Sequence, residues 1–169
     1  KRALVTGGGR GIGKEIALLL HKLGAKVAVL DRGAEDLEAL KKEIPCETVR
    51  VDLLDTEAAV KAARQVLPID LLVNSAGVVN MESFLDTTVK NFDETLGVNV
   101  RAMMVISQVV ARDLVARKAP GAIVNISSVA AIDPFPGFAL YGPTKAWVNT
   151  FTQALAVEGK PHGIRFFAI

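Results

Sequence analysis

Two kinds of hydrophobic pattern alternate along the chain. Short continuous apolar runs are typical of strands that are buried on both faces of a sheet. Most of them are followed by a longer segment in which apolar residues recur at helical spacing. The expected strands are Ala3–Thr6, Lys26–Leu30, Thr48–Val51, Ile69–Val73, Ala122–Ile126 and Ile164–Ile169. The expected helices are Ile12–Leu23, Ala34–Ile44, Thr56–Leu67, Phe92–Arg117 and Thr144–Glu158, while Val78–Lys90 and Asp133–Gly137 are expected to be irregular.

This alternation of strands and helices predicts a doubly wound parallel sheet with helices on both faces, the α/β class. Half of the 169 residues are hydrophobic and only 5% are aromatic, so aliphatic side chains fill the core. No repeat, low-complexity segment or linker interrupts the pattern, and we expect residues 1–169 to form a single domain. Ile169 lies inside an apolar strand, and a bare apolar edge strand promotes aggregation. We therefore expect further residues after Ile169 and a domain that is incomplete at its C-terminus.

Charge and cysteine content exclude several kinds of partner. The formal net charge is +2 and the basic and acidic residues are interspersed, so no basic tract predicts binding to nucleic acid. No apolar run approaches the ~20 residues of a membrane span. The single cysteine, Cys46, cannot form an internal disulfide, which favours a reducing, cytoplasmic location. His21 and His162 have no metal-ligand spacing around them, and no metal site is expected.

A glycine-rich segment, Thr6–Gly13, joins the first expected strand to the first expected helix. Glycines allow the backbone to turn sharply and to approach a pyrophosphate, towards which the N–H groups of the helix start then point. The spacing is a T-G-x-x-x-G-x-G variant of the dinucleotide-binding pattern, and a glycine turn without a ligand is the alternative. The residues expected to bind a nucleotide here are Gly7, Gly9, Arg10, Gly11, Ile12 and Gly13.

Asp31 ends the second expected strand, close to the ~20-residue offset at which a dinucleotide-binding fold places its ribose-binding carboxylate. This carboxylate can accept hydrogen bonds from ribose hydroxyls and would repel a 2′-phosphate, so it favours NAD(H) over NADP(H). Arg10 and Arg32 could instead hold that phosphate through charge-assisted contacts, which keeps NADP(H) possible. Capping of the following helix is the alternative role for Asp31.

Three candidate catalytic residues follow in the second half of the chain. Ser128 comes directly after a buried strand, at the edge of the sheet where open α/β folds bind ligands, although Ser127 has a similar position. Tyr141, the only tyrosine, precedes Lys145 by one helical turn, so both side chains lie on one helix face. An ammonium beside a phenol favours the phenolate, which makes the tyrosine a usable general acid or base.

These residues, in this order, resemble the short-chain dehydrogenase/reductase family, and the resemblance runs from Ala3 to Ile169. The matching segments are Thr6–Gly13, Asp52-Leu53, Asn74-Ser75-Ala76-Gly77, Asn99, Ser128 and Tyr141–Lys145. The runs Asp70–Gly77 and Asn99–Ser128 are similar to the L-xylulose (dicarbonyl) reductases and related sugar or polyol dehydrogenases. The resemblance implies a Rossmann-type sheet that lacks the family's C-terminal strand and substrate loop, in a homo-oligomer (dimer or tetramer).

The implied activity is hydride transfer between a nicotinamide cofactor and a small ketose, polyol or dicarbonyl. Tyr141 would exchange the proton, Ser128 rather than Ser127 would hold the substrate oxygen, and Lys145 would grip the nicotinamide ribose and tune the tyrosine. Asn99 would hold open the long helix and a water that links Lys145 to solvent. Further cofactor contacts are implied for Asp52 and Leu53 at the adenine, and for Asn74, Ala76 and Gly77 beside the fourth strand.

Alternatives exist for single residues and for the whole protein. Without the other motifs, Asn99 would be an ordinary polar helix residue and Asp52 a cap of the next helix. Gly142 and Pro143 stand where the family more often has small polar residues, but proline is tolerated in a first helical turn. A ketoacyl reductase that uses NADPH is disfavoured by Asp31 and the mixed surface charges. A catalytically idle nucleotide-binding or interaction protein on the same fold is disfavoured because the catalytic set is intact.

Overall fold

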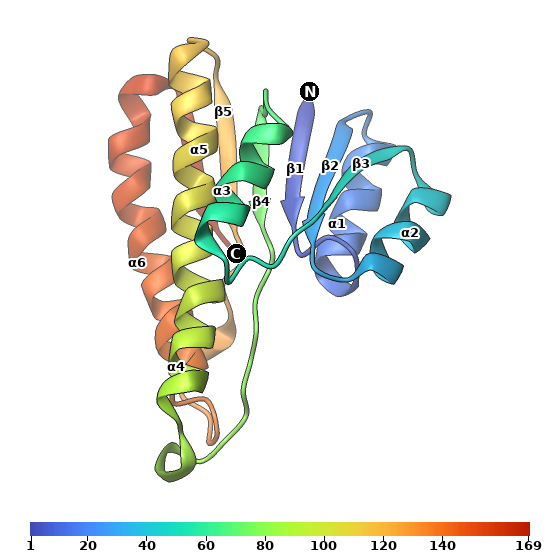
Figure 1. Ribbon diagram of the computed structural model, residues 1–169. Helices are drawn as coiled ribbons and strands as arrows, with labels where there is room; N and C mark the ends of the chain where they lie inside the picture. Colours follow the sequence, from blue (N-terminus) through green and yellow to red (C-terminus); the bar gives the residue numbers. More distant parts are fainter.

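A computed structural model describes residues 1–169 and contains one six-stranded parallel sheet between two layers of helices (Figure 1). The strands lie in the order β3-β2-β1-β4-β5-β6, which confirms the predicted doubly wound fold. The strands are β1 (Arg2–Thr6), β2 (Lys26–Asp31), β3 (Cys46–Arg50), β4 (Leu71–Asn74), β5 (Gly121–Asn125) and β6 (Ile164–Ala168). The α-helices are α1 (Gly11–Lys22), α2 (Ala34–Glu43), α3 (Thr56–Gln65), α4 (Val89–Leu96), α5 (Met103–Ala116) and α6 (Tyr141–Gly159).

The strands divide their side chains between two hydrophobic clusters, one on each face of the sheet. Leu4 and Leu30 pack in the cluster that α3 and α5 cover, whereas Val5 and Val29 pack in the cluster that α1 and α2 cover. Successive residues of a strand point to opposite faces, so a continuous apolar run supplies both clusters at once. The third helix on the first face is α6, which lies beside α5 (Figure 1).

The order of the strands reverses between β1 and β4. The chain proceeds from β1 outwards to β3 and then returns through α3 to pair β4 with the other side of β1. The loops that follow β1 and β4 therefore diverge and leave a crevice at the carboxyl ends of the strands, where open α/β sheets bind ligands.

The long helix expected over Phe92–Arg117 is divided in the structure. The α4 helix begins earlier, at Val89, because the Thr88 hydroxyl caps it by accepting a hydrogen bond from the N–H of Asn91 at 3.1 Å. A six-residue π-helical turn, Gly97–Ala102, then separates α4 from α5. Apolar spacing could not reveal this wide turn, which is a local change in hydrogen bonding often found at functional sites.

Most other boundaries differ from the prediction by one or two residues, and the contacts explain two of the differences. The α6 helix begins at Tyr141 rather than Thr144, because Pro143 lies in its first turn, where backbone N–H groups lack helical partners in any case. The β3 strand begins at Cys46 rather than Thr48, because Cys46 already pairs with Val27 of β2.

The outer edge of β6 is unpaired. Phe167 and Ile169 in and beside this strand remain 44% and 75% exposed. β6 is therefore the edge strand on this side of the sheet.

Candidate active site

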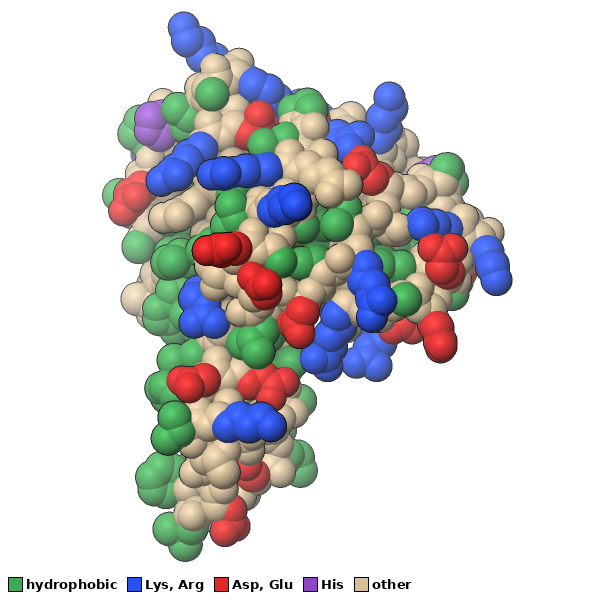
Figure 2. Space-filling model, in the orientation of Figure 1, with side chains coloured by type: hydrophobic (Ala, Val, Ile, Leu, Met, Phe, Trp, Pro, Cys, Tyr) green, Lys and Arg blue, Asp and Glu red, His purple; other side chains and the backbone are tan.

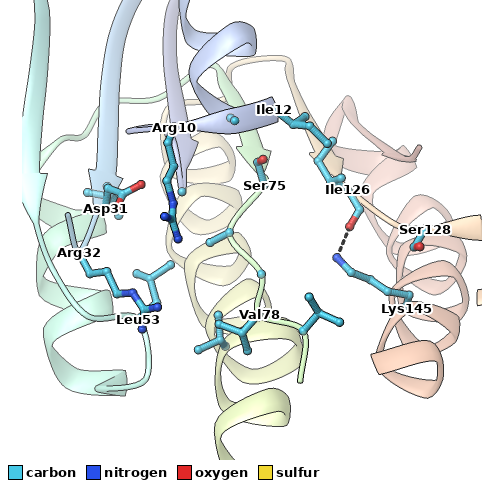
Figure 3. Close-up of a pocket in the computed structure, with 18 of the residues that line it drawn as sticks. Arg10, Ile12, Asp31, Arg32, Leu53, Ser75, Val78, Ile126, Ser128 and Lys145 are labelled. Carbon is cyan, nitrogen blue, oxygen red and sulfur yellow. Dashed lines mark hydrogen bonds between the residues drawn. The ribbon is translucent and has the colours of Figure 1, made fainter. Parts of the chain in front are cut away.

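A cavity of about 570 Å³ opens at the carboxyl ends of the strands, where the strand order reverses (Figure 3). Most of the predicted site residues line it, namely Gly7, Arg10, Gly11, Ile12, Gly13, Asp31, Arg32, Asp52, Leu53, Ala76, Gly77, Ser128, Tyr141 and Lys145. Gly9, Asn74 and Asn99 are not among the residues that line this cavity. No cluster of three or more His, Cys, Asp or Glu side chains is placed to hold a metal ion. None of the helices combines the length and the hydropathy needed to cross a membrane.

The glycine loop has the geometry of an anion cradle. Gly7 and Gly11 adopt positive φ angles of 64° and 55°, which side-chain-bearing residues rarely adopt. A Cβ on Gly13 would lie 2.2 Å from the carbonyl oxygen of Gly7, so only glycine allows α1 to start this close to β1. A Cβ on Gly11 would meet nothing within 4 Å, because the loop faces open space there. The backbone at the start of α1 is thus free to approach a phosphate.

Asp31 is held in place by backbone donors on both sides. Its Oδ2 accepts a hydrogen bond from the N–H of Gly9 at 2.9 Å, and its Oδ1 accepts one from the N–H of Gly33 at 2.9 Å. The α2 helix has no side-chain cap at Gly33, so Asp31 fixes the turn ahead of α2 rather than capping the helix itself. Arg10 and Arg32 extend along the same side of the cavity (Figure 3). One carboxylate and two guanidinium groups therefore surround this end of the cavity.

Asp52 and Leu53 also line the cavity. The Oδ1 atom of Asp52 accepts a hydrogen bond from the N–H of Leu54 at 2.9 Å, which closes a local turn. The cap of α3 is Asp55, whose carboxylate accepts from the N–H of Ala58 at 3.0 Å. Asp52 is therefore not the helix cap, and it lies in the wall of the cavity instead.

Lys145 is a buried residue of α6 that lines the cavity. Its side chain is buried, and Nζ donates a hydrogen bond to the carbonyl oxygen of Ile126 at 2.7 Å (Figure 3). Nζ also lies 5.6 Å from the centroid of the Tyr141 ring. Burial disfavours the charged amine and lowers the pKa of Lys145 from 10.5 to about 8. The ammonium is thus held beside the phenol ring by the backbone of the segment that carries the serines.

The structure distinguishes the two serines that follow β5. The hydroxyl of Ser127 donates its proton to the carbonyl oxygen of Lys145 at 3.3 Å, so it is engaged with the backbone of α6. The Ser128 oxygen accepts a hydrogen bond from the N–H of Ala130 at 3.1 Å, which leaves its own proton free to donate. Ser128 therefore has the hydroxyl that can donate to an oxygen in the cavity.

Asn99 lies in the π-helical turn and is fully buried. Its Oδ1 accepts from the N–H of Val78 at 2.8 Å, and its Nδ2 donates to the carbonyl oxygen of Val78 at 2.9 Å. The same amide nitrogen donates to the Thr144 hydroxyl at 3.2 Å. Asn99 thus joins the segment after β4 to α6, next to Lys145. The water expected between Asn99 and Lys145 stays a prediction.

A buried polar network behind the cavity was not found from the sequence. The amide nitrogen of Asn74 donates to the Ser107 hydroxyl at 3.0 Å and to Oδ1 of Asn125 at 2.8 Å. Asn125 donates in turn to the Thr152 hydroxyl at 2.9 Å. These hydrogen bonds connect α5, β4, β5 and α6. Asn74 was expected to line the cavity, but its side chain belongs to this buried network instead. The only signal of this network in the sequence is that two apolar strands each end in an asparagine. Asn74 and Asn125 pair in register in the sheet.

Comparison with known proteins gives one consistent family. The sequence model of the short chain dehydrogenase family matches residues 1–169. L-xylulose reductase of Bos taurus is 46% identical over 170 residues, which cover 100% of this chain and 70% of that protein. Carbonyl reductase [NADPH] 2 of Sus scrofa is 46% identical over 165 residues, 97% of this chain and 68% of that protein. The crystal structure of a metagenomic short-chain oxidoreductase in complex with NADP has a TM-score of 0.94 and 32% identity, covering 99% of this chain and 79% of that one.

Proposed function

The chain belongs to the short-chain dehydrogenase family, and we propose that it reduces a small carbonyl compound, or oxidises the matching alcohol, with a nicotinamide dinucleotide. The observation that carries this proposal is that Ser128, Tyr141 and Lys145 line the same cavity as the glycine loop. The alternative of a catalytically idle protein does not fit the relatives, which are named as reductases.

The cavity fits a dinucleotide. Gly11 faces open space at the start of α1, and Gly7 and Gly13 allow the loop to pack closely against Ala76 and the first turn of α1. This arrangement suits a pyrophosphate at the helix start. From there we place the adenine against Asp52 and Leu53, the middle of the cofactor against Ala76 and Gly77, and the nicotinamide ribose at Lys145. The resemblance implies these placements and the lining of the cavity supports them. When bound, the nicotinamide supplies a hydride to the carbonyl carbon or accepts one from the alcohol carbon.

The protein's own residues transfer the proton and stabilise the charges that form. In reduction, the phenol of Tyr141 gives its proton to the carbonyl oxygen as the carbon becomes tetrahedral, and the product is the alcohol. The Ser128 hydroxyl donates a hydrogen bond to the same oxygen and stabilises its developing negative charge. The Lys145 ammonium, 5.6 Å from the ring centroid, favours the phenolate that remains on Tyr141. In oxidation the proton moves in the opposite direction.

The type of cofactor is a separate question. The sequence-based preference was NAD(H), but the relatives whose names include a cofactor name NADPH or NADP. We therefore propose NADP(H), with its 2′-phosphate between Arg10 and Arg32. Two backbone N–H groups already share the charge of Asp31, but its carboxylate still opposes the phosphate. Binding titrations with NADPH and NADH decide between the two.

Three variants of the intact enzyme test the reaction. Tyr141→Phe removes only the phenol oxygen, so we expect turnover to be lost while the cofactor still binds. Ser128→Ala is expected to lower turnover by about 100-fold or more, the usual effect of losing one donor to a developing oxyanion. Ser127→Ala is the matched control and is expected to retain most of the activity. Full activity in Tyr141→Phe, or equal losses in both serine variants, would refute the assignment.

A further inference from the structure

The segment between the two expected catalytic residues Ser128 and Tyr141 is unusually apolar. Its twelve residues, Val129–Leu140, include one charged side chain, Asp133, and no Ser, Thr, Asn, Gln or His. A substrate whose carbonyl oxygen meets Ser128 and Tyr141 must pass close to this segment. The chemistry of the segment therefore bears directly on the substituents of that carbonyl.

This segment is packed against the beginning of α6. A short helical turn, Val129–Ala131, starts at Ser128, and a Cβ on Gly142 would lie 2.8 Å from the carbonyl oxygen of Ala130. The N–H of Gly142 donates to the carbonyl oxygen of Phe138 at 2.9 Å. The position of the segment is thus fixed relative to Tyr141.

Its aromatic side chains lead to the phenol. The rings of Phe135 and Phe138 meet edge to face with centroids 6.0 Å apart, and the ring of Phe138 lies 5.6 Å from that of Tyr141. Both distances are typical of favourable aromatic pairs. Phe138 is half-buried, whereas Phe135 and Val129 are exposed, although both are large apolar residues.

A second segment adds apolar side chains from the other side. Val79 lines the cavity together with Ser128 and Tyr141. The N–H of Glu82 donates to the carbonyl oxygen of Gly137 at 3.2 Å, which joins the segment after β4 to the one before α6. Met81 reaches the same contact, since its Cγ lies 3.1 Å from where a Cβ on Gly137 would be. Figure 2 shows hydrophobic side chains along the edges and at the tip of the projection that α4 and its neighbouring loops form, with charged side chains over its middle.

Two polar side chains of the segment after β4, Asn80 and Glu82, each contact α4. The Asn80 amide donates to the Thr95 hydroxyl at 3.5 Å, and the Glu82 carboxylate accepts from the Asn91 amide at 2.7 Å. Thr95 and Asn91 both belong to α4. These contacts hold the two polar groups towards the helix rather than towards a substrate.

We propose that Val79, Met81, Val129, Phe135 and Phe138 form an apolar rim that selects carbonyl compounds with an apolar or aromatic substituent over polyhydroxylated ketoses. The inference rests on the proposed function and specifies its substrate class. The hydroxyls of a ketose would lose hydrogen bonds to water at this rim, whose five side chains offer no polar partner. An aryl or alkyl group would instead remove apolar surface from water on both sides.

Three carbonyl compounds test this on the intact enzyme. We compare kcat/KM for 1-phenylpropane-1,2-dione, for butane-2,3-dione and for a four-carbon ketose, which cannot close into a ring. The rim predicts that the phenyl dione exceeds butane-2,3-dione by at least about tenfold, because a pocket gains roughly that factor from even one well-placed methylene. The ketose is expected to be the poorest of the three.

Variants locate the preference. Phe138→Ser and Val129→Gln should each reduce the ratio of kcat/KM for the phenyl dione to kcat/KM for butane-2,3-dione by about fivefold or more. Phe92→Ser on α4 is the control, because it makes the same substitution at an exposed phenylalanine outside the rim. It should retain the wild-type preference. If Phe138→Ser is unstable in a melting experiment, Val129→Gln on its exposed turn decides.

The outcomes separate the two proposals. A ketose that is reduced as well as the phenyl dione overturns the apolar rim but leaves the proposed function standing. Rim variants with an unchanged substrate preference also overturn the proposal. The rim side chains would then be covered by another part of the protein and would not contact the substrate. Reduction of none of the three compounds refutes the proposed function and the rim together.

Discussion

Replacement of Lys145 by methionine should stabilise the cofactor-free fold while it abolishes hydride transfer. The side chain of Lys145 is only 3% exposed. Its pKa is about 8 in the folded protein, compared with the ordinary value of 10.5. A difference of one pKa unit corresponds to about 1.36 kcal/mol, so folding disfavours the charged amine by about 3 kcal/mol. Methionine has a similar length and no charge, so Lys145→Met removes the free-energy cost of burying the charged amine.

The gain is reduced by one lost hydrogen bond. The carbonyl oxygen of Ile126 accepts from Nζ at 2.7 Å, and a lost bond of this kind costs about 1–2 kcal/mol. The expected net stabilisation is therefore about 1–2 kcal/mol at pH 7. For a domain of this size that corresponds to a Tm higher by roughly 2–8 °C.

The stabilisation by Lys145→Met should decrease as the pH rises. Between pH 8 and 10.5 the unfolded chain holds the Lys145 proton and the folded protein does not, so rising pH stabilises the wild type through this group. Lys145→Met lacks this gain, and the difference in Tm should shrink from pH 7 to about pH 10. Thermal unfolding of both proteins without cofactor at the two pH values measures it. A variant that is less stable at pH 7, or a difference that does not shrink, would refute the reasoning.

Three other perturbations test separate parts of the structure. Asp31→Ala should raise the affinity for NADPH relative to NADH by at least about tenfold in a fluorescence titration, because it removes a negative charge beside Arg10 and Arg32; an unchanged ratio would exclude Asp31 from cofactor choice. Gly13→Ala should weaken cofactor binding by about 100-fold or more, since its Cβ would lie 2.2 Å from the Gly7 oxygen, whereas Glu15→Ala on the same helix should bind normally. The N–H of Arg2, with the charges of Lys1 and Arg117, holds the pKa of Asp70 below its usual range. The stability that Asp70 contributes is therefore present at neutral pH and lost as the pH falls through the folded-state pKa, so Asp70→Asn should destabilise by about 1 kcal/mol at pH 7 and by nothing in strong acid.

The sequence predicted that most of the candidate residues gather at one edge of the sheet, because these residues lie where apolar runs end. Gly7–Gly13, Asp31 and Ser128 each follow or end a buried strand, and parallel strands bring their carboxyl ends to one edge. The spacing of Tyr141 and Lys145 then needed only a helix to place both side chains on one face.

Features that depend on side-chain direction could not be predicted. Asn74 was expected in the cavity wall, but its amide turns towards Ser107 and Asn125 inside the protein. The π-helical turn around Asn99 was also invisible, because Gly97–Ala102 continues the apolar spacing of the helices on both sides. Such details are set by contacts between distant segments, which no local pattern records.

The most direct test of the account follows a deuterium atom. The intact enzyme is given reduced cofactor that carries deuterium at the transferable C4 position, together with a dione, and the alcohol is examined by mass spectrometry. The account predicts one deuterium on the alcohol carbon with the wild type, and no labelled alcohol with a Tyr141→Phe variant that still binds cofactor. An unlabelled alcohol from the wild type, or a labelled alcohol formed at the wild-type rate by Tyr141→Phe, would contradict it.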